Sequence, residues 1–321
     1  LNHDVTSICG DLRDYDDTLA QFKGVDLVFG GPPCQGFSVA GKMDPHDERS
    51  QLIWHFFDKV EALKPTSFVC ENVKALAVNS RWEQIKQGLI TKAEQLGYVT
   101  ALVLLNASDF DVPQSRERMF LIGIKTSERN ISSIDFKTAL YASLEKKKQK
   151  PATISSLIHK LGPAGSENNN RICSAIITYA KNPVLRKSAY AGMLFNGAGR
   201  PINPRGVALT LPASMGGNKT PIVDEDEIFS AQPSYIEQYH HQLRDGTPPR
   251  TGMAPPRLRR ITIDEALAIQ TFPSHYKLAG SQSAMFRQIG NAVPCRLAQV
   301  VAQSVNEVLN LGVSAFIHHQ S

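Results

Sequence analysis

Residues 27–42, "LVFGGPPCQGFSVAGK", decide how the sequence is organised, because a short apolar run stops abruptly at two glycines and two prolines. The apolar run that ends at residue 29 predicts a strand. Pro32 and Pro33 then fix the backbone without offering N–H groups, and one cysteine, Cys34, follows. The Gly, Gln and Ser residues around Cys34 are typical of a loop, so the residues alone leave a buried structural thiol and a nucleophile both open.

Strands and helices alternate outward from this stretch through the first 125 residues. Short apolar runs at 5–9, 25–29, 66–70, 98–105 and 118–124 predict strands, and amphipathic runs at 50–63 and 81–97 predict helices. Gly97 is expected to close the second helix. This alternation predicts an α/β fold with a parallel, doubly wound sheet. Ligands of such sheets lie beyond the carboxyl ends of the strands, so Cys34 and Glu71 are expected at one site.

The second half of the chain has a different texture. The charged run "EKKKQK" at 145–150 predicts a linker, and residues 151–257 are rich in Gly, Pro and Asn. Helical periodicity returns at 262–270, where Thr262 and Glu265 have capping-box spacing, and a closing helix is expected over 291–312. We therefore expect a catalytic domain at 1–145, an irregular second domain at 150–257, and a segment at 258–321 that returns to the first.

Composition excludes several classes of protein. The chain has 321 residues, of which 42% are hydrophobic and 20% charged, and no apolar run reaches the roughly 18 residues of a membrane span. Five widely spaced cysteines and the absence of zinc-ligand spacing predict reduced thiols in a cytoplasm and no metal. Residues 1–125 carry a net charge of −4 and residues 126–321 a net charge of +9, which favours a polyanion partner for the second half.

Two motifs place charged side chains beside predicted strands. Glu71, in "CENV", follows an apolar strand and either faces a cleft or is an ordinary exposed loop acid. Arg116 and Arg118, in "VPQSRERMF", are two residues apart, so on a strand their side chains share a face. That face either is solvated or holds a phosphate or a carboxylate.

Taken together, these segments resemble the carbon-5 cytosine-specific DNA methyltransferases of bacterial restriction–modification systems, in the family's own order. "GGPPCQGFS" is similar to the catalytic Pro-Cys-Gln motif, "ENV" to the Glu-Asn-Val motif, and "VPQSRER" to Gln-x-Arg-x-Arg. "DERSQL" (47–52), "RRITIDEALAIQTFP" (259–273) and "QIGNAVP" (288–294) resemble three further motifs. The resemblance implies a Rossmann-like methyltransferase sheet followed by a target-recognition domain.

The resemblance also implies a mechanism that explains these residue types. Cys34 would supply a thiolate that adds to carbon 6 of a flipped-out cytosine. Glu71 would hydrogen-bond ring nitrogen 3 and the exocyclic amine, and Arg118 would contact the base and orient Glu71, with Arg116 in support. S-adenosylmethionine is the implied methyl donor, leaving as S-adenosylhomocysteine. Its implied contacts are Asp11, Leu12, Pro33, Gln35, Asn291 and Val293.

The sequence departs from the family pattern in two places. The family's Phe-x-Gly-x-Gly motif (the glycine motif) and an acidic residue after the second strand should both precede Gly10, but they are absent. We therefore expect the segment that carries them to lie outside this chain or on a second polypeptide. "FNGAG" at 195–199 is the one match to the glycine motif, but it lacks a strand-to-helix context and is interpreted as a decoy. Asp111 stands where the family usually has glycine; if that glycine serves a left-handed turn, aspartate tolerates the turn better than most residues.

Double-stranded DNA is the expected partner. Its candidate contacts are Ser38, Gln114, Arg200, Arg205, Thr210, Lys219 and Arg257, and for each arginine a solvated surface charge is the alternative. We further expect a cytoplasmic monomer, with a cognate restriction endonuclease but no stable complex. A tRNA cytosine-5 methyltransferase and an inert DNA-binding homologue are the rival functions. The long variable region favours DNA, and the presence of Cys34, Glu71 and Arg118 argues against an inert protein.

Overall fold

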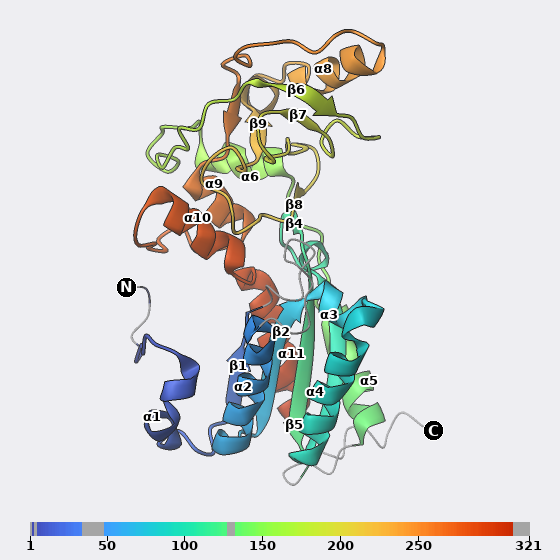
Figure 1. Cartoon of the computed structure of the whole chain (residues 1–321), viewed down its shortest axis with the longest axis vertical. Helices are drawn as coiled ribbons and strands as arrows, with labels where there is room; N and C mark the ends of the chain where they lie inside the picture. The colour runs from blue at the N-terminus through green and yellow to red at the C-terminus, as the bar shows by residue number, and fades with distance from the viewer. Residues whose placement is uncertain (1, 3–4, 34–47, 127–131, 311–321) are drawn as a thin grey trace. The chain divides into compact units, whose positions relative to one another are not determined.

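The computed structural model describes residues 2, 5–33, 48–126 and 132–310 (Figure 1). The chain divides into two compact units. The first, here called the sheet unit, comprises Asp4–Asn106, Glu117–Lys148 and Val300–Ser321. The second, here called the loop-rich unit, comprises Leu1–His3, Ala107–Arg116 and Gln149–Gln299. The chain therefore leaves the sheet unit after residue 106 and comes back to it at residue 117.

A four-stranded sheet organises the sheet unit, in the order β1-β2-β5-β3. Its strands are β1 (Leu27–Gly30), β2 (Ser67–Val73), β3 (Tyr98–Asn106) and β5 (Glu117–Lys125). The α/β class is confirmed, and β1 and β2 are parallel as expected, but β5 is antiparallel to both of its neighbours. No crossover helix lies between β3 and β5 within the sheet unit, and antiparallel strands need none.

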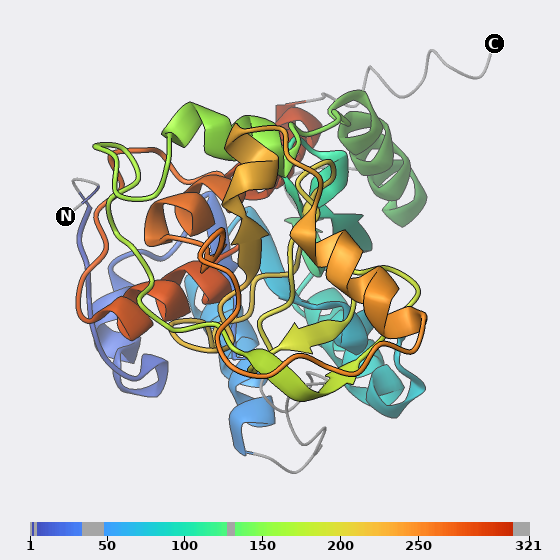
Figure 2. The same cartoon turned by 90° about the horizontal axis from the view of Figure 1, so that it is seen from above.

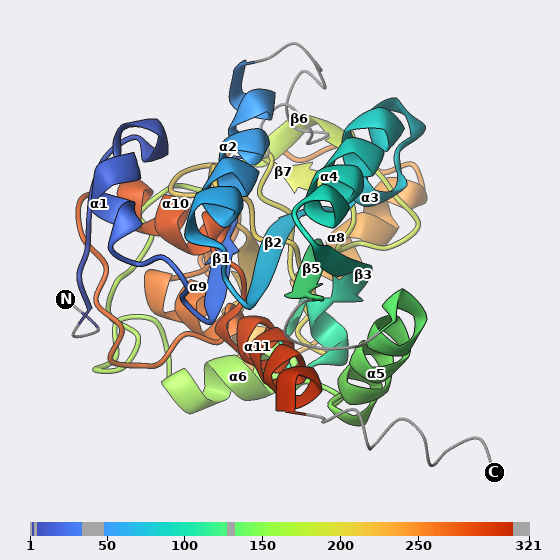
Figure 3. The ribbon, with the colours of Figure 1, turned by 90° about the horizontal axis from the view of Figure 1, so that it is seen from below.

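Helices cover both faces of this sheet, as a doubly wound fold requires. Figure 3 shows α2 (Glu48–Leu63) and α4 (Glu83–Gln95) on one face, with α5 (Ser133–Lys146) and α11 (Cys295–Asn310) on the other. Under α2 and α4, the aromatic rings of Phe57 and Phe68 pack edge to face with their centroids 5.4 Å apart. On the other face, Lys147 forms an ion pair with Glu307 of α11 at 2.6 Å. Smaller elements are η1 (Leu12–Asp14), α1 (Asp16–Ala20), α3 (Lys74–Val78) and η2 (Ser80–Trp82).

Several element boundaries differ from the sequence-based expectations. Residues 5–9 are exposed and form no strand, so that prediction was wrong. Strand β2 runs past residue 70 to Val73, because Val73 still pairs with Arg118 of β5. Gly97, with φ of +84°, follows α4 as expected, and Asp111, with φ of +61°, adopts a left-handed conformation.

The loop-rich unit combines short strand pairs with short helices. Its strands pair as β4–β8, β6–β7 and β9–β10, and they are β4 (Gln114–Ser115), β6 (Tyr179–Val184), β7 (Met193–Phe195), β8 (Ala208–Leu209), β9 (Ile222–Asp224) and β10 (Leu258–Arg260). Its helical elements are η3 (Ala107–Asp109), α6 (Ile154–Leu161), α7 (Glu225–Phe229), α8 (Tyr235–Arg244), α9 (Ile263–Ile269) and α10 (Gln282–Asn291). One core lies around α6, α9 and α10. A second lies around β6, β7 and α8, which lie side by side in Figure 2. Tyr239 of α8 packs against Tyr179 of β6, with ring centroids 5.0 Å apart.

The C-terminal helical region confirms one expectation and corrects another. Thr262 and Glu265 form the predicted capping box at the start of α9. The closing helix expected over 291–312 is α11, which begins only at Cys295, and a separate helix, α10, ends at Asn291. Pro294 explains the break, since the residue before a proline is disfavoured in a helix. No helix in the described part of the chain is long and apolar enough to cross a membrane.

Candidate functional site

The approach to Cys34 runs along the carboxyl end of β1, where Gly31 lies against Glu71. A Cβ atom added to Gly31 would stand 3.0 Å from Oε2 of Glu71, so glycine permits this close approach. The neighbouring Asn72 is buried, and its Nδ2 donates to the carbonyl of Pro32 at 3.3 Å. The "ENV" motif therefore contacts the two residues that lead towards the thiol. Cys34 itself, with Gln35 and Ser38, lies outside the described residues.

Glu71 and Arg118 form an ion pair on one face of the sheet. Glu71 pairs in register with Phe120, and Arg118 is two residues from Phe120 on the same strand, so both charged side chains share a face. Arg118 Nε lies 3.0 Å from Oε1 of Glu71, and only 15% and 18% of their side chains are exposed. Glu71 lies within β2 rather than beyond its end. The arrangement presents an oriented carboxylate beside Gly31, three residues before Cys34.

Arg116 has different surroundings from Arg118. It lies between β4 and β5, so the two arginines do not share one strand as expected. Arg116 is 2% exposed and belongs to the loop-rich unit. Its guanidinium donates to the carbonyls of Leu211 and Gly290 at 3.2 and 2.9 Å. The side chain thus holds two backbone segments of that unit together.

Gln114 extends the same buried network and is no solvent-facing DNA contact in this structure. Its side chain is fully buried. Its amide donates to Oε1 of Gln270 at 3.1 Å and its Oε1 accepts from the Leu211 N–H at 2.8 Å. Gln270 in turn donates to the carbonyl of Ile289 at 2.8 Å. Burial and the use of both ends of the amide explain why the motif needs glutamine here.

A pocket of about 510 Å³ opens beside β1 in the sheet unit. Its lining includes Asp11 and Leu12 from the N-terminal segment, Pro33, which directly precedes Cys34, and apolar side chains of β1 and α2. Phe29, at its edge, is 78% exposed, which is unusual for a large ring and leaves apolar surface that a bound group would cover. The volume and the mixture of apolar walls with one acidic acceptor fit a nucleoside-sized group such as S-adenosylmethionine.

Asp11 is held in place by its own loop. Arg13 donates to its two carboxylate oxygens at 2.9 and 2.6 Å, and these hydrogen bonds hold the pKa of Asp11 well below its usual range. Gly10 packs against the ring of Tyr15, whose hydroxyl donates to the carbonyl of Cys9 at 3.0 Å. Asp11 is therefore ionised at neutral pH, with lone pairs left over to accept from a ligand. Asn291 and Val293 lie in the loop-rich unit, at the end of α10 and in the following loop.

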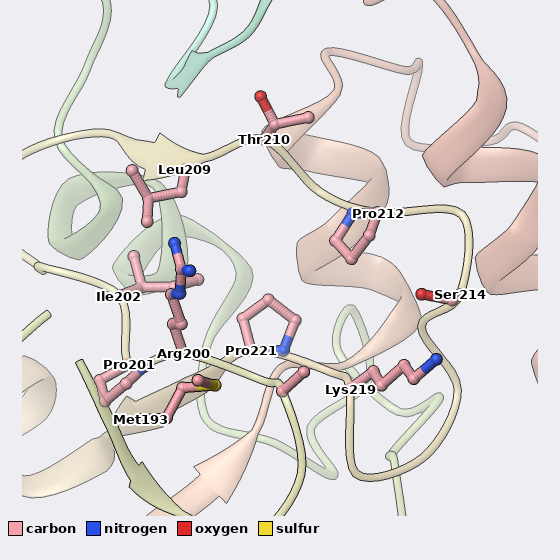
Figure 4. Close-up of a pocket in the computed structure, with 11 residues that line it drawn as sticks. Met193, Arg200, Pro201, Ile202, Leu209, Thr210, Pro212, Ser214, Lys219 and Pro221 are labelled. Carbon is pink, nitrogen blue, oxygen red and sulfur yellow. The ribbon is translucent and has the colours of Figure 1, made fainter. Parts of the chain in front are cut away.

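Among the predicted DNA contacts, three gather around a second hollow, of about 320 Å³, in the loop-rich unit (Figure 4). These are Arg200, Thr210 and Lys219. The other two arginines do not join them. Arg205 is paired with the carboxylates of Glu227 and Glu237, and Arg257 donates to Asp224 at 2.7 Å. These two arginines therefore stabilise the unit itself, and their geometry does not favour the expected DNA contact.

The family model of C-5 cytosine-specific DNA methylases matches residues 1–307. The chain belongs to this family. It is 28% identical over 289 residues to the type II methyltransferase M.AplI of Arthrospira platensis, covering 88% of this chain and 69% of that protein. It is 29% identical over 310 residues to M.HindV of Haemophilus influenzae, covering 95% and 83%. The S. pombe Dnmt2 methyltransferase has a similar fold, with a TM-score of 0.56 at 16% identity, covering 93% and 81%.

The protein is thus a DNA cytosine-5 methyltransferase, as the motifs predicted. The methyltransferase's four described cysteines are free thiols, consistent with the expected reduced state. Burial, helped by the neighbouring Glu71 carboxylate, raises the pKa of the Cys70 thiol well above its usual range. Cys70 is therefore a structural side chain of β2 and no rival to Cys34. In the described part of the chain, no group of three or more His, Cys, Asp or Glu side chains is placed to hold a metal.

Two features of the methyltransferase were missed or rejected from sequence. Leu52 and Phe56 line the pocket from α2, and their apolar spacing alone gives no sign of that role. "FNGAG" was interpreted as a decoy, and residues 196–224, all of them described, contain no helix. Its glycines allow close backbone packing instead, since a Cβ at Gly199 would lie 2.0 Å from the carbonyl oxygen of Thr220.

Residues 168–223, which include the lining of this hollow, have an unusual charge composition. This stretch of the methyltransferase contains no Asp or Glu, but seven basic residues. They are Arg171, Lys181, Arg186, Lys187, Arg200, Arg205 and Lys219. A run free of carboxylates is unusual for a solvated surface and is typical of a polyanion-binding face.

Proposed function

We propose that this enzyme methylates carbon 5 of a flipped-out cytosine in duplex DNA through a transient covalent bond to Cys34. The observation that carries the proposal is the Glu71–Arg118 ion pair, on strands β2 and β5, beside the backbone that leads to Cys34. An oriented carboxylate next to a thiol is the constellation that covalent activation of a pyrimidine requires.

The chemistry balances with these residues in named roles. The Cys34 thiolate forms a bond to carbon 6, and the electrons of the carbon 5–carbon 6 double bond move towards carbon 5, which becomes nucleophilic. S-adenosylmethionine supplies the electrophilic methyl group when bound. Carbon 5 then loses its proton to a base, the double bond re-forms, and the Cys34 thiolate leaves. The enzyme's thiol is regenerated, and cytosine gains one methyl group in place of one proton.

Glu71 stabilises the activated ring and Arg118 keeps Glu71 in position. A carboxyl group at Glu71 contacts ring nitrogen 3 and the exocyclic amine, where charge changes most during addition. Arg118 pairs with Oε1 of Glu71, and Gly31, which has no side chain, leaves room beside Oε2. The target base must leave the duplex stack to reach these groups, so base flipping is part of the proposal.

The pocket beside β1 is proposed to hold the methyl donor. Asp11 provides a fixed acceptor for the adenine amino group, Leu12 and Leu52 provide apolar walls, and Phe29 offers an exposed ring. Pro33 lines the same pocket immediately before Cys34, which brings the donor site and the thiol together along the chain. Gln35, Asn291 and Val293 are proposed to complete the site.

The loop-rich unit is proposed to contact DNA, with residues 150–257 as the target-recognition domain. The carboxylate-free run at 168–223 supplies the electrostatic attraction. Arg200, Thr210 and Lys219 supply contacts at the hollow, and Ser38 contributes from the cysteine loop. Arg116 and Gln114 act as positioning residues, because their hydrogen bonds hold the backbone at Leu211.

Transfer of a tritiated methyl group from S-adenosylmethionine to duplex DNA tests this function in the full-length protein. We expect label in cytosine, abolished by Cys34→Ser and retained by Cys9→Ser, which alters an exposed cysteine. Label in tRNA but not in DNA would contradict the proposed substrate. DNA binding without any label from the full-length enzyme would contradict the proposed catalysis.

A further inference from the structure

We propose that the hollow at Arg200 and Lys219 reads the major-groove edge of a guanine, with Arg200 as the base-reading side chain. The inference rests on the proposed DNA methylation and names one base in the recognised sequence. It assigns sequence discrimination to a single described side chain, whereas the charge pattern alone predicts only attraction to DNA.

The chemistry of the lining selects the base. Arg200 and Lys219 offer only hydrogen-bond donors, and no carboxylate or amide side chain occurs among the described residues that line the hollow. The Thr210 hydroxyl donates to the Ser115 carbonyl at 2.8 Å and points away from Arg200 in Figure 4, so it offers no acceptor beside the guanidinium. Guanine presents two acceptors, O6 and N7, to the major groove, whereas thymine presents one acceptor and cytosine and adenine each present an amino group that needs an acceptor. The paired donors of the Arg200 guanidinium therefore suit guanine best.

The backbone under Arg200 and Lys219 is fixed by hydrogen bonds between two segments. The Ile222 N–H donates to the carbonyl of Arg200 at 3.1 Å, and the Gly199 N–H donates to the carbonyl of Asn218 at 3.1 Å. Gly199 allows this approach, because a Cβ there would overlap the Thr220 carbonyl. The backbone that carries both side chains is therefore fixed, so less conformational entropy is lost when Arg200 and Lys219 bind DNA.

Arg200 also differs from several arginines of its unit. Arg205, Arg257 and Arg259 each lie within ion-pair distance of a carboxylate. Arg200 is exposed, and its guanidinium, unlike its backbone carbonyl, has no hydrogen bond or ion pair with any described residue. A planar guanidinium with all of its donors available is the group that forms paired hydrogen bonds to guanine O6 and N7.

The walls of the hollow favour a base over a phosphate. Figure 4 shows Arg200 rising between apolar side chains, among them Ile202 and Pro221, while Lys219 extends away from Arg200 on the far side of Pro221, below Ser214. A phosphate is bound best by polar surroundings and converging backbone N–H groups. Apolar walls around a guanidinium match the flat, partly apolar edge of a base pair instead.

Methylation of a random duplex library by the full-length enzyme, followed by sequencing of the methylated cytosines, tests the inference. The wild type is expected to require guanine at one position at least. Arg200→Ala should lower discrimination at that one guanine by about 10- to 100-fold and leave the other positions unchanged. Arg200→Lys keeps the charge but not the planar fork, so it should also lose discrimination. Arg244→Ala, an exposed arginine at the end of α8, is the matched control.

Base analogues at the assigned position then identify the contacted atoms. 7-Deazaguanine lacks the N7 acceptor, so it should reduce methylation by the wild type but not by Arg200→Ala. Inosine keeps O6 and N7, so the wild type should methylate duplexes that carry it at this position. A uniform loss across all sequences in Arg200→Ala would assign a phosphate contact and overturn the inference, as would an unchanged sequence preference. Selecting the same library for DNA binding measures the base preference without methyl transfer. The inference can therefore still be tested if the enzyme binds DNA but does not methylate it.

Discussion

At the scale of single residues, the ion pair of Glu71 and Arg118 is the feature on which the proposed chemistry depends. Glu71→Gln keeps the shape of the side chain but removes its negative charge. We expect it to lower kcat by about 10²- to 10³-fold, because a positioned charge that stabilises the transition state is removed. DNA affinity should change little. Single-turnover methylation together with equilibrium DNA binding measures both; equal losses in the two would show that Glu71 serves binding and not catalysis.

Gly31 offers a test of how tightly the carboxylate is positioned. A methyl group at residue 31 would stand 3.0 Å from Oε2 of Glu71, so Gly31→Ala should displace the carboxylate. We expect kcat to fall by about 10- to 100-fold, since small displacements at a reacting centre have effects of this size. If the methyl group acts only through Glu71, combining Gly31→Ala with Glu71→Gln should add little to the loss from Glu71→Gln. Additive losses would refute that route.

At the scale of elements, the Gln114–Gln270 hydrogen bond joins the "VPQSRER" loop to the end of α9. Gln114→Ala would remove the acceptor of the buried Leu211 N–H and one partner of the Gln270 side chain. We expect the free energy of unfolding to fall by about 1–3 kcal/mol, as measured by urea denaturation. Gln238→Ala, at an exposed position of α8, should change it by less than about 0.5 kcal/mol. Equal effects of the two substitutions would contradict the assigned role of the network.

The sequence predicted the strands and helices more accurately than the roles of individual side chains. The apolar runs predicted β1, β2, β3 and β5. Strands β2, β3 and β5 leave this plain apolar signal because they are largely buried, whereas the apolar side chains of β1 are exposed or half-buried. The direction of β5 was not predictable, since it depends on the chain's excursion through the loop-rich unit. Motif order likewise placed Glu71 and Arg118 together, but it assigned Gln114 to DNA. Whether a polar residue of a motif is buried is decided by tertiary packing, which the local pattern does not record.

At the scale of the whole molecule, the carboxylate-free run predicts how DNA affinity depends on salt. Lys181, Arg186 and Lys187 are exposed side chains of β6 and the loop that follows it. Replacing all three by alanine should reduce the slope of log affinity against log salt by about 0.9 for each phosphate that is no longer neutralised. Arg205→Ala should leave the slope nearly unchanged, because Glu227 and Glu237 already balance its charge. Titrations over a range of salt concentrations measure these slopes, and an unchanged slope in the triple variant would remove this surface from the DNA interface.

The covalent bond between Cys34 and cytosine is the central claim, and it is tested most directly by trapping that bond. Duplex DNA carrying 5-fluorocytosine lacks the proton whose loss releases the enzyme. Incubated with full-length protein and S-adenosylmethionine, it should give a denaturation-resistant complex, whose digestion yields a peptide containing Cys34 joined to a methylated fluorocytosine. An adduct at any other residue, or methylation of ordinary DNA by Cys34→Ser at the wild-type rate, would contradict the account.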